Sequence, residues 1–302
     1  LKPQKAFALA TGGRFVFKRP SGKEYTENEV PCGKCRLCLQ RQTMDLATVQ
    51  YHEAIWQEAG PGLGQNYFIT FTYRDQDLPT HSILDHKDWQ RCMKNLRQKQ
   101  TRFAKKLNFD QDQMERIKFT YSMCGEYGDQ TNRPHFHANM FNLWLPDAVK
   151  KGEDANGITL ISSKMLNEAW GKGHIQIKAF SMKSAIYLAK HNQNQAGEDS
   201  KNKHRQRWYA IKERQRIKYN EENGTDFEIV AHDSITHEPW PVNTKVPYTQ
   251  SSRRPAPGRK FFEKYKSDAE KGHFTVNGRP VPIPRQYLRR IKENDPLAYA
   301  ER

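Results

Sequence analysis

IKFTYSMCGEYGDQTNRPHFHANMFNLWL, residues 117–145, contains the two segments that decide the fold. Both sides of the polar run GDQTNR are rich in β-branched and aromatic side chains. This pattern predicts two strands that pair as an antiparallel hairpin. Because alternate residues of a strand face the same side, we expect His135 and His137 to project together, while Phe136 faces a core on the other side.

The segments around this hairpin follow the patterns of further strands and helices. Periodic apolar residues and caps indicate helices, and short β-branched and aromatic runs indicate strands. In chain order we expect a helix over 36–59, a strand over 66–73, a helix over 86–107, hairpin strands over 117–127 and 135–145, a helix over 162–170, a strand over 173–180 and a helix over 181–191.

From residue 66 onward, the expected order is strand, helix, strand, strand, helix, strand, helix. This is the split βαβ or ferredoxin-like order with one additional C-terminal helix. We therefore predict an α+β protein whose core, over 66–192, is a ferredoxin-like or RRM-like antiparallel sheet with helices on one side. Residues 1–65 are expected to form an N-terminal segment with cysteines and a helix, and 193–302 a basic extension that packs on the core.

The chain is strongly basic. Its 302 residues include 50 Lys and Arg against 34 Asp and Glu, which gives a formal net charge of +16. Such a charge attracts polyanions, and the Trp, Tyr and Phe side chains supply rings that can stack on unpaired bases. Nucleic acid is therefore the expected partner.

The sequence lacks two kinds of segment. No apolar stretch is long enough to span a bilayer or to act as a secretion signal, so we expect a soluble protein of the cell interior with no membrane partner. No GxxxxGK[ST] loop occurs either. We therefore expect a separate helicase to supply strand separation, with a polymerase as a further partner.

His135 and His137 form half of a metal site, but an HxH pair alone is a weak signal. Glu126 strengthens it, because closing the hairpin brings the end of the preceding strand beside the imidazoles. Two imidazoles and one carboxylate suit Mg²⁺ or Mn²⁺ where phosphate oxygens complete the coordination, and Zn²⁺ is chemically compatible. In a basic protein, this site indicates phosphoryl-transfer chemistry.

Tyr187 is the candidate nucleophile, with Lys190 and His191 on the same helical face. A tyrosine pKa near 10 makes the phenol a poor nucleophile unless an ammonium group or a metal favours the phenolate. The alternative is that Tyr187 is a packed aromatic and Lys190 a solvated charge. The combination of histidine pair, upstream carboxylate and downstream YxxK favours a DNA nickase.

Cys32, Cys35 and Cys38 form a CxxCxxC motif that is compact enough to bind one Zn²⁺. A structural zinc usually has four protein ligands, and the alternative is that the cysteines are small apolar packing residues. Candidates for the fourth ligand are Cys124, His52 and Cys92.

The sequence resembles the HUH endonucleases, and more closely the rolling-circle replication initiators of gokushovirus-like microviruses, which are small single-stranded DNA phages. The segments that carry the resemblance are VPCGKCRLCLQRQ, FITFTYRDQDLP, CGEYGDQTNRPHFHA, AIYLAKH, GRKFFEKY and VNGRPVPIPRQYL.

The resemblance implies a site-specific nickase and strand-joining enzyme that acts on origin DNA in the cytoplasm of a bacterial host. It implies that Glu126, His135 and His137 bind the metal, that Tyr187 forms a 5′-phosphotyrosyl intermediate, and that Lys190 assists at the scissile phosphate. A host helicase and DNA polymerase are the implied partners. Expected DNA contacts are Arg133, His191, Arg205, Arg207, Arg253 and Arg254.

His191 departs from related initiators, which often carry a second tyrosine at that position. Tyr187 then acts alone, a tyrosine elsewhere serves, or a second copy of the chain in an oligomer supplies it. A further hypothesis is that His191 is a proton shuttle, since histidine titrates near neutral pH.

Two other functions remain open at this point. One is a transposase or conjugative relaxase, although relaxases generally place the tyrosine near the N-terminus and add a third histidine. The other is a non-enzymatic, zinc-bearing DNA-binding protein in which the histidines are structural. A Tyr187→Phe variant separates these functions, because only an enzyme would lose cleavage.

Overall fold

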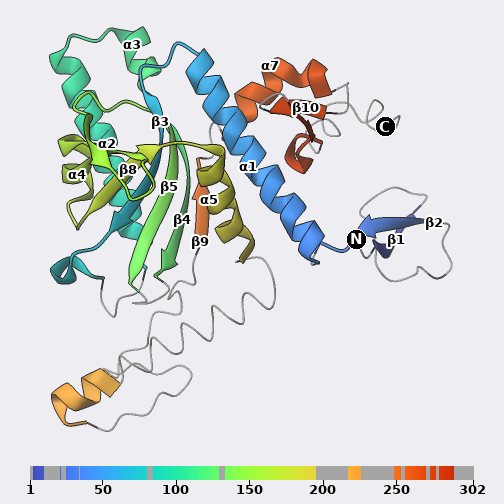
Figure 1. The fold of residues 1–302 in the computed structure, drawn as a ribbon, viewed down its shortest axis with the longest axis horizontal. Coiled ribbons are helices and arrows are strands. Elements are labelled where there is room, and N and C mark those ends of the chain that lie inside the picture. Colours follow the sequence, from blue (N-terminus) through green and yellow to red (C-terminus); the bar gives the residue numbers. More distant parts are fainter. Residues whose placement is uncertain are drawn as a thin grey trace.

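The fold is an α+β arrangement around one large antiparallel sheet (Figure 1). The structure is a computed structural model. It describes residues 3–9, 21, 25–33, 35–79, 84–128, 133–194, 217–225, 248–252, 256–269, 273–276 and 279–288.

The sheet has seven strands, all paired antiparallel. From one edge to the other they are β6 (Val149–Glu153), β7 (Thr159–Ser162), β8 (Ile175–Ala179), β3 (Gln65–Thr72), β5 (Pro134–Leu143), β4 (Thr120–Tyr127) and β9 (Tyr248–Ser251).

Helices and two small hairpins surround this sheet. The helices are α1 (Arg36–Ala59), α2 (His86–Lys106), α3 (Gln111–Arg116), α4 (Lys164–Trp170), α5 (Met182–Asn194) and α7 (Arg259–Ala269), with a 3-10 turn at Asp75–Asp77 and further helical turns over 217–223 and 285–288. The hairpins are β1 (Pro3–Leu9) with β2 (Tyr25–Pro31), and β10 (His273–Val276) with β11 (Arg279–Pro282).

The four strands expected from the sequence are adjacent at the centre of the sheet. They lie in the order β8, β3, β5, β4, with every pair antiparallel. This order is compatible with a ferredoxin-like core. The remaining strands widen the sheet: the β6–β7 hairpin, which the sequence analysis did not predict, extends it beyond β8, and β9 pairs with β4 at the other edge.

One face of the sheet packs against α2 and α4 and forms the main apolar core. Phe71 of β3 makes edge-to-face contacts with Trp89 of α2 and with Trp170 of α4. Phe136 of β5 also contacts Trp170 edge-to-face and is fully buried. Phe136 therefore faces the core, as the alternation of the strand predicted. The N-terminal cap that the sequence indicated for α4 is Ser163, whose hydroxyl accepts from the third helical N–H group.

Helices cover both faces, so the expectation of helices on one side of the sheet is wrong. α1 and α5 pack against each other over the second face (Figure 1). Gln50 of α1 accepts a hydrogen bond from Asn139 of β5 at 2.6 Å. Glu53, one turn later, accepts one from Thr120 of β4 at 2.9 Å. α1 thus meets the sheet partly through buried polar side chains, which leave no apolar stripe in the sequence.

The described C-terminal residues pack against α1. The backbone N–H of Gly258 donates to Oε2 of Glu53 at 2.8 Å. Gly258 has a φ of +74°, and a Cβ atom there would lie 2.6 Å from the Tyr287 hydroxyl, so glycine is required on both counts. A small apolar cluster joins this segment to the helix and consists of Val49, Phe261, Phe262, Ile283 and Tyr287. Among the described helices, none is long and apolar enough to cross a membrane.

Candidate active site

Three side chains that can ligate a metal meet at one end of the β4–β5 hairpin. Glu126 lies opposite His135 in the strand register, and His137 follows on the same face of β5. The Nε2 atoms of His135 and His137 lie 3.1 Å and 2.9 Å from Oε1 of Glu126. One ligand atom from each residue lies within 4.8 Å of the others. The structure thus brings the predicted carboxylate and the two imidazoles together.

The second nitrogen of each imidazole is held by the protein. Nδ1 of His135 lies 3.1 Å from the carbonyl oxygen of Arg133, and Nδ1 of His137 lies 2.9 Å from the hydroxyl of Thr70. Because a carbonyl oxygen only accepts, Nδ1 of His135 donates, and Nε2 of the neutral ring presents a lone pair to the Glu126 carboxylate. Two facing acceptors are favourable only with a cation between them, so these residues fit a metal ion.

Burial and mutual contact set the electrostatics of these ligands. Glu126 and His137 are each 8% exposed. Burial alone would raise the pKa of the Glu126 carboxyl, but hydrogen bonds from His135, His137 and His191 hold it well below its usual range. Burial lowers the pKa of His137, against the opposing effect of Glu126. These shifts favour an ionised carboxylate and a neutral His137 imidazole, the forms that bind a metal.

Helix α5 adds two side chains to this group. The Tyr187 hydroxyl lies 3.2 Å from Oε1 of Glu126 and 3.2 Å from Nε2 of His137. One helical turn later, Nδ1 of His191 pairs with Oε2 of Glu126. The rings of Tyr187 and His191 are 4.6 Å apart, and Tyr187 is 40% exposed. An accessible phenol beside a carboxylate and imidazoles has the geometry of a nucleophile next to proton acceptors.

The remaining predicted residues are placed differently. Lys190 is exposed and forms no hydrogen bond or ion pair with the described part of the chain. Arg133 pairs with Asp75 and donates from Nη2 to the carbonyl oxygen of Tyr73 at 2.8 Å, so it holds the hairpin end against the end of β3. Four predicted DNA contacts lie outside the described residues: Arg205, Arg207, Arg253 and Arg254.

Two residues of β3 support the site and were missed by the sequence analysis. Thr70 contacts His137 as described above, and the ring of Phe68 stacks on that imidazole with the centroids 5.5 Å apart. Phe68 also meets Tyr187 edge-to-face at 5.8 Å. Strand alternation puts Phe68 and Thr70 on one face, but their partners follow from the β3–β5 register, for which the sequence contains no local signal.

The part of the chain that carries the site has known relatives. Residues 66–196 match a family model of replication-associated proteins of the ORF2 type. These residues therefore form a replication-associated domain, and it contains Glu126, His135, His137 and Tyr187. No solved structure matches the chain.

Phage proteins align with the replication-associated domain and beyond it. "Replication-associated protein VP4" of Bdellovibrio phage phiMH2K is 28% identical over 100% of this chain and 79% of its own length. "Replication-associated protein ORF2" of Spiroplasma virus 4 is 28% identical over 65% of this chain and 61% of its own length. "Replication-associated protein ORF4" of Chlamydia phage 1 is 30% identical over 54% and 38%. These similarities support a microvirus-like replication initiator, and the predicted resemblance is confirmed.

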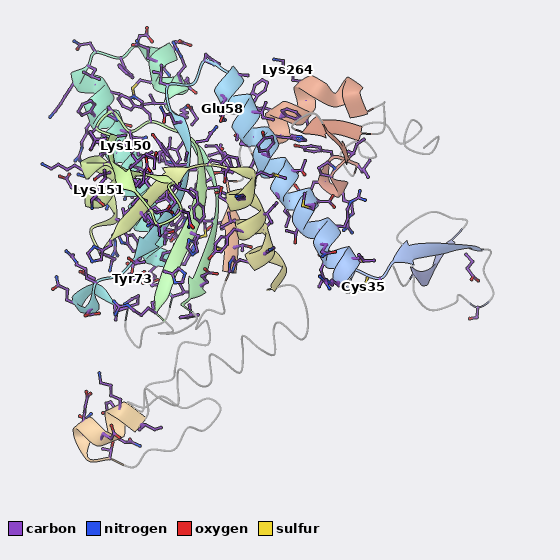
Figure 2. The ribbon with its side chains drawn as sticks, viewed as in Figure 1. Cys35, Glu58, Tyr73, Lys150, Lys151 and Lys264 are labelled. Carbon is purple, nitrogen blue, oxygen red and sulfur yellow. The ribbon has the colours of Figure 1, made fainter. Side chains whose placement is uncertain are left out.

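A second group of candidate ligands lies outside the replication-associated domain. The Sγ atoms of Cys32, Cys35 and Cys38 all lie within 4.8 Å of one another at the start of α1, where Figure 2 labels Cys35. The predicted fourth ligands are elsewhere: His52 is 14 residues further along α1, Cys92 is on α2 and Cys124 is on β4. Among the described residues, the metal-ligand group at this position contains the three cysteines alone.

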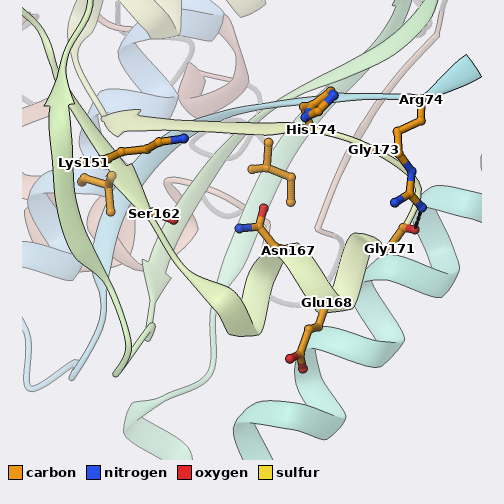
Figure 3. A pocket seen from close by; sticks show the side chains of 10 residues that line it. Arg74, Lys151, Ser162, Asn167, Glu168, Gly171, Gly173 and His174 are labelled. Carbon is orange, nitrogen blue, oxygen red and sulfur yellow. Dashed lines mark hydrogen bonds between the residues drawn. The ribbon is translucent and has the colours of Figure 1, made fainter.

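A surface pocket in the replication-associated domain is separate from this site (Figure 3). Its lining comes from the β7–α4 region and from the chain before β8, and it includes none of the metal ligands or Tyr187. At its rim, Arg74 donates to the carbonyl oxygen of Gly171 at 2.8 Å. Labelled lining residues are Arg74, Lys151, Ser162, Asn167, Glu168, Gly171, Gly173 and His174.

Proposed function

We propose that this chain is an HUH-type endonuclease that nicks and rejoins single-stranded origin DNA, and so initiates rolling-circle replication of a small DNA phage. The observation that carries the proposal is the contact of the Tyr187 hydroxyl with Glu126 and His137. These residues lie inside the replication-associated domain. The central strand order, β8, β3, β5, β4, supports an HUH-type core of the ferredoxin-like kind.

Glu126, His135 and His137 are the residues that would hold a divalent ion, Mg²⁺ or Mn²⁺. When bound, such an ion supplies positive charge that stabilises the oxygens of a phosphodiester undergoing substitution. The chain orients the ligands through the carbonyl of Arg133 and the hydroxyl of Thr70. Rigid strands hold metal ligands more accurately than a loop would.

Tyr187 performs the substitution at phosphorus. Its phenolic oxygen forms a bond to the scissile phosphorus while the bond from phosphorus to the 3′ oxygen breaks. The phenolic proton leaves to the side of Glu126 and His137, whose acceptor atoms are 3.2 Å away, and the departing 3′ oxygen takes up a proton. One phosphoester replaces another, so attack by a 3′ hydroxyl on the phosphotyrosine rejoins the strand without ATP.

The expected partners follow from the surface of the chain. The net charge of +16 attracts the DNA backbone, and exposed Lys190, three residues after Tyr187, is the proposed contact to the scissile phosphate. Arg133 is already paired with Asp75, so we assign it to support of the hairpin before any DNA contact. A host helicase and DNA polymerase, in the cytoplasm of the bacterial host, would act on the free 3′ hydroxyl.

The test is a covalent adduct. The full chain is incubated with Mn²⁺ and labelled single-stranded DNA that covers the genome encoding it, and adducts are separated in denaturant. Tyr187→Phe should abolish the adduct and leave DNA binding intact. Tyr121→Phe, on the opposite face of β4, is the matched control and should keep it.

Two outcomes would contradict the proposal. If Tyr187→Phe forms as much adduct as the wild type, another residue is the nucleophile. If the wild type binds the DNA but forms no adduct with any divalent ion, the chain is a DNA-binding protein and not a nickase.

A further inference from the structure

The cysteine cluster at the start of α1 has the geometry of a metal site independent of the proposed nickase. Cys32 directly follows β2, Cys35 is the N-terminal cap residue of α1, and Cys38 lies in its first turn. The Sγ atoms of Cys32 and Cys38 are 3.8 Å apart. All five cysteines of the chain are free thiols.

The sulfur spacing distinguishes between a disulfide and a metal. A disulfide requires two sulfurs about 2.05 Å apart. Tetrahedral Zn²⁺ with Zn–S bonds of about 2.3 Å places its sulfurs about 3.8 Å apart. The separation of Cys32 and Cys38 equals the edge of that tetrahedron.

The backbone around the cysteines supports the same geometry. Gly33 has a φ of +72°, a left-handed conformation that turns the chain between Cys32 and Cys35. The N–H of Cys35 donates to Sγ of Cys32 at 3.2 Å, and Gln42 holds the carbonyl oxygen of Gly33 at 3.2 Å. An N–H group that donates to a sulfur favours the thiolate, as outer contacts do in metal sites.

The start of α1 also favours anionic sulfur. α1 is 24 residues long, has no side-chain cap at Cys35 and no acidic residue in its first turn. Its first N–H groups and the positive end of its dipole therefore face the thiols without a competing carboxylate.

Apolar packing is the weaker explanation for the cluster. Cys32 and Cys35 are only partly buried, and Cys38 alone is buried. None of the three belongs to an apolar cluster of the described residues. Side chains that serve only to fill an apolar core would need such neighbours.

We propose that Cys32, Cys35 and Cys38 bind one structural Zn²⁺ as thiolates. The fourth position is taken by water or by a group outside the described residues. The ion fastens the β1–β2 hairpin, which projects beyond the first turn of α1, to that helix (Figure 1). Because α1 packs on α5, the helix of Tyr187, the zinc fixes the hairpin to the same structural unit that carries the candidate active site.

The test uses the full reduced chain and Co²⁺ as a spectroscopic replacement for Zn²⁺. Thiolate ligands give Co²⁺ an intense sulfur-to-metal charge-transfer absorption, which imidazole and carboxylate ligands do not give. The wild type should show this absorption, and one equivalent of Zn²⁺ should remove it. His135→Ala should keep the absorption, whereas Cys38→Ser should lose it.

A second measurement covers the case in which Cys38→Ser does not fold. X-ray absorption of the zinc-loaded wild type should show three sulfur neighbours at about 2.3 Å. Absence of the charge-transfer absorption from the reduced wild type, or a zinc environment without sulfur, overturns the proposal. Its failure would leave the adduct experiment on Tyr187 untouched, since that experiment does not depend on the cysteines.

Discussion

The hydroxyl of Tyr187 lies 3.2 Å from Oε1 of Glu126, although 61 residues separate them in the chain. Glu126 is fixed near the end of β4 and Tyr187 lies within α5, so the contact depends on how α5 crosses the sheet. Both His135 and His137 lie on the same carboxylate oxygen. One buried carboxylate thus connects the candidate nucleophile to the candidate metal ligands.

Replacing Glu126 with glutamine tests this connection. Glutamine has nearly the same shape but removes the negative charge that a divalent ion requires. We expect the rate of adduct formation at fixed Mn²⁺ to fall by at least about 100-fold, the upper end of what loss of an outer contact to a metal ligand costs. The measurement is a single-turnover cleavage rate on labelled DNA.

Glu168→Gln is the matched control for that experiment. Glu168 is an exposed carboxylate on α4, paired with Lys99 on the other side of the sheet. Its loss should leave the cleavage rate unchanged. A Glu126→Gln variant that cleaves at the wild-type rate would remove the carboxylate from the proposed site.

Thr70 should act through His137 and not on DNA. Thr70→Val keeps the shape of the side chain but removes the hydroxyl 2.9 Å from Nδ1 of His137. Loss of such an orienting contact typically costs about 10- to 100-fold in metal affinity. We expect the Mn²⁺ concentration for half-maximal cleavage to rise by that factor, with a smaller change in rate at saturating Mn²⁺.

Thr70→Ser keeps the hydroxyl and should restore the wild-type Mn²⁺ dependence. If Thr70→Val and Thr70→Ser behave alike in a Mn²⁺ titration, the hydroxyl does not orient the ligand. Equal DNA affinity of both variants would show that the effect lies in the metal site.

His191 occupies the place of a second nucleophile. It lies one turn after Tyr187, and both side chains contact Glu126. We therefore expect the double variant Tyr187→Phe, His191→Tyr to regain a DNA adduct that Tyr187→Phe lacks, at a lower level than the wild type. Peptide mapping of the adduct should place the DNA on residue 191.

The matched control for the double variant is Tyr187→Phe with His191→Phe, which has no phenol at either position and should form no adduct. If the tyrosine at position 191 also forms none, only position 187 presents an oxygen to the phosphate. In that case a second cleavage by this chain requires a tyrosine from elsewhere.

The parts of the site that rest on local periodicity could be predicted from the sequence. Strand alternation places His135 and His137 together with Phe136 on the opposite face, and the short hairpin brings Glu126 beside them. Helical spacing likewise places Tyr187 and His191 on one face. Each of these relationships spans few residues and needs only the period of a single element or hairpin.

The position of α1 over the second face could not be predicted in this way. Its contacts with the sheet include Gln50 to Asn139 and Glu53 to Thr120, pairs separated by 89 and 67 residues. Because these are buried polar contacts, no apolar period indicates which side of α1 is covered. The same limit applies to Thr70, whose role emerges only when the β3–β5 register is known.

His52 should make the stability of the chain depend on pH. Its ring stacks on Phe261 with the centroids 4.1 Å apart, and its Nδ1 lies 3.2 Å from the Tyr287 hydroxyl, so it joins α1 to the C-terminal residues. Burial lowers the pKa of His52 to about 4. In the unfolded chain its pKa is about 6.5, so between these values the unfolded state binds more protons than the folded state.

The neutral His52 therefore contributes stability above about pH 6.5 that is lost as the pH falls towards 4, and the full difference is about 3 kcal/mol. We expect His52→Phe, which keeps a stacking ring but cannot be protonated, to lose less stability than the wild type between pH 7 and pH 4.5 in urea unfolding. His174→Gln, which changes a histidine outside this contact, should follow the wild type. Equal pH dependence of His52→Phe and the wild type would mean that protonation of His52 does not oppose folding, and that the C-terminal residues separate from α1 at low pH for another reason.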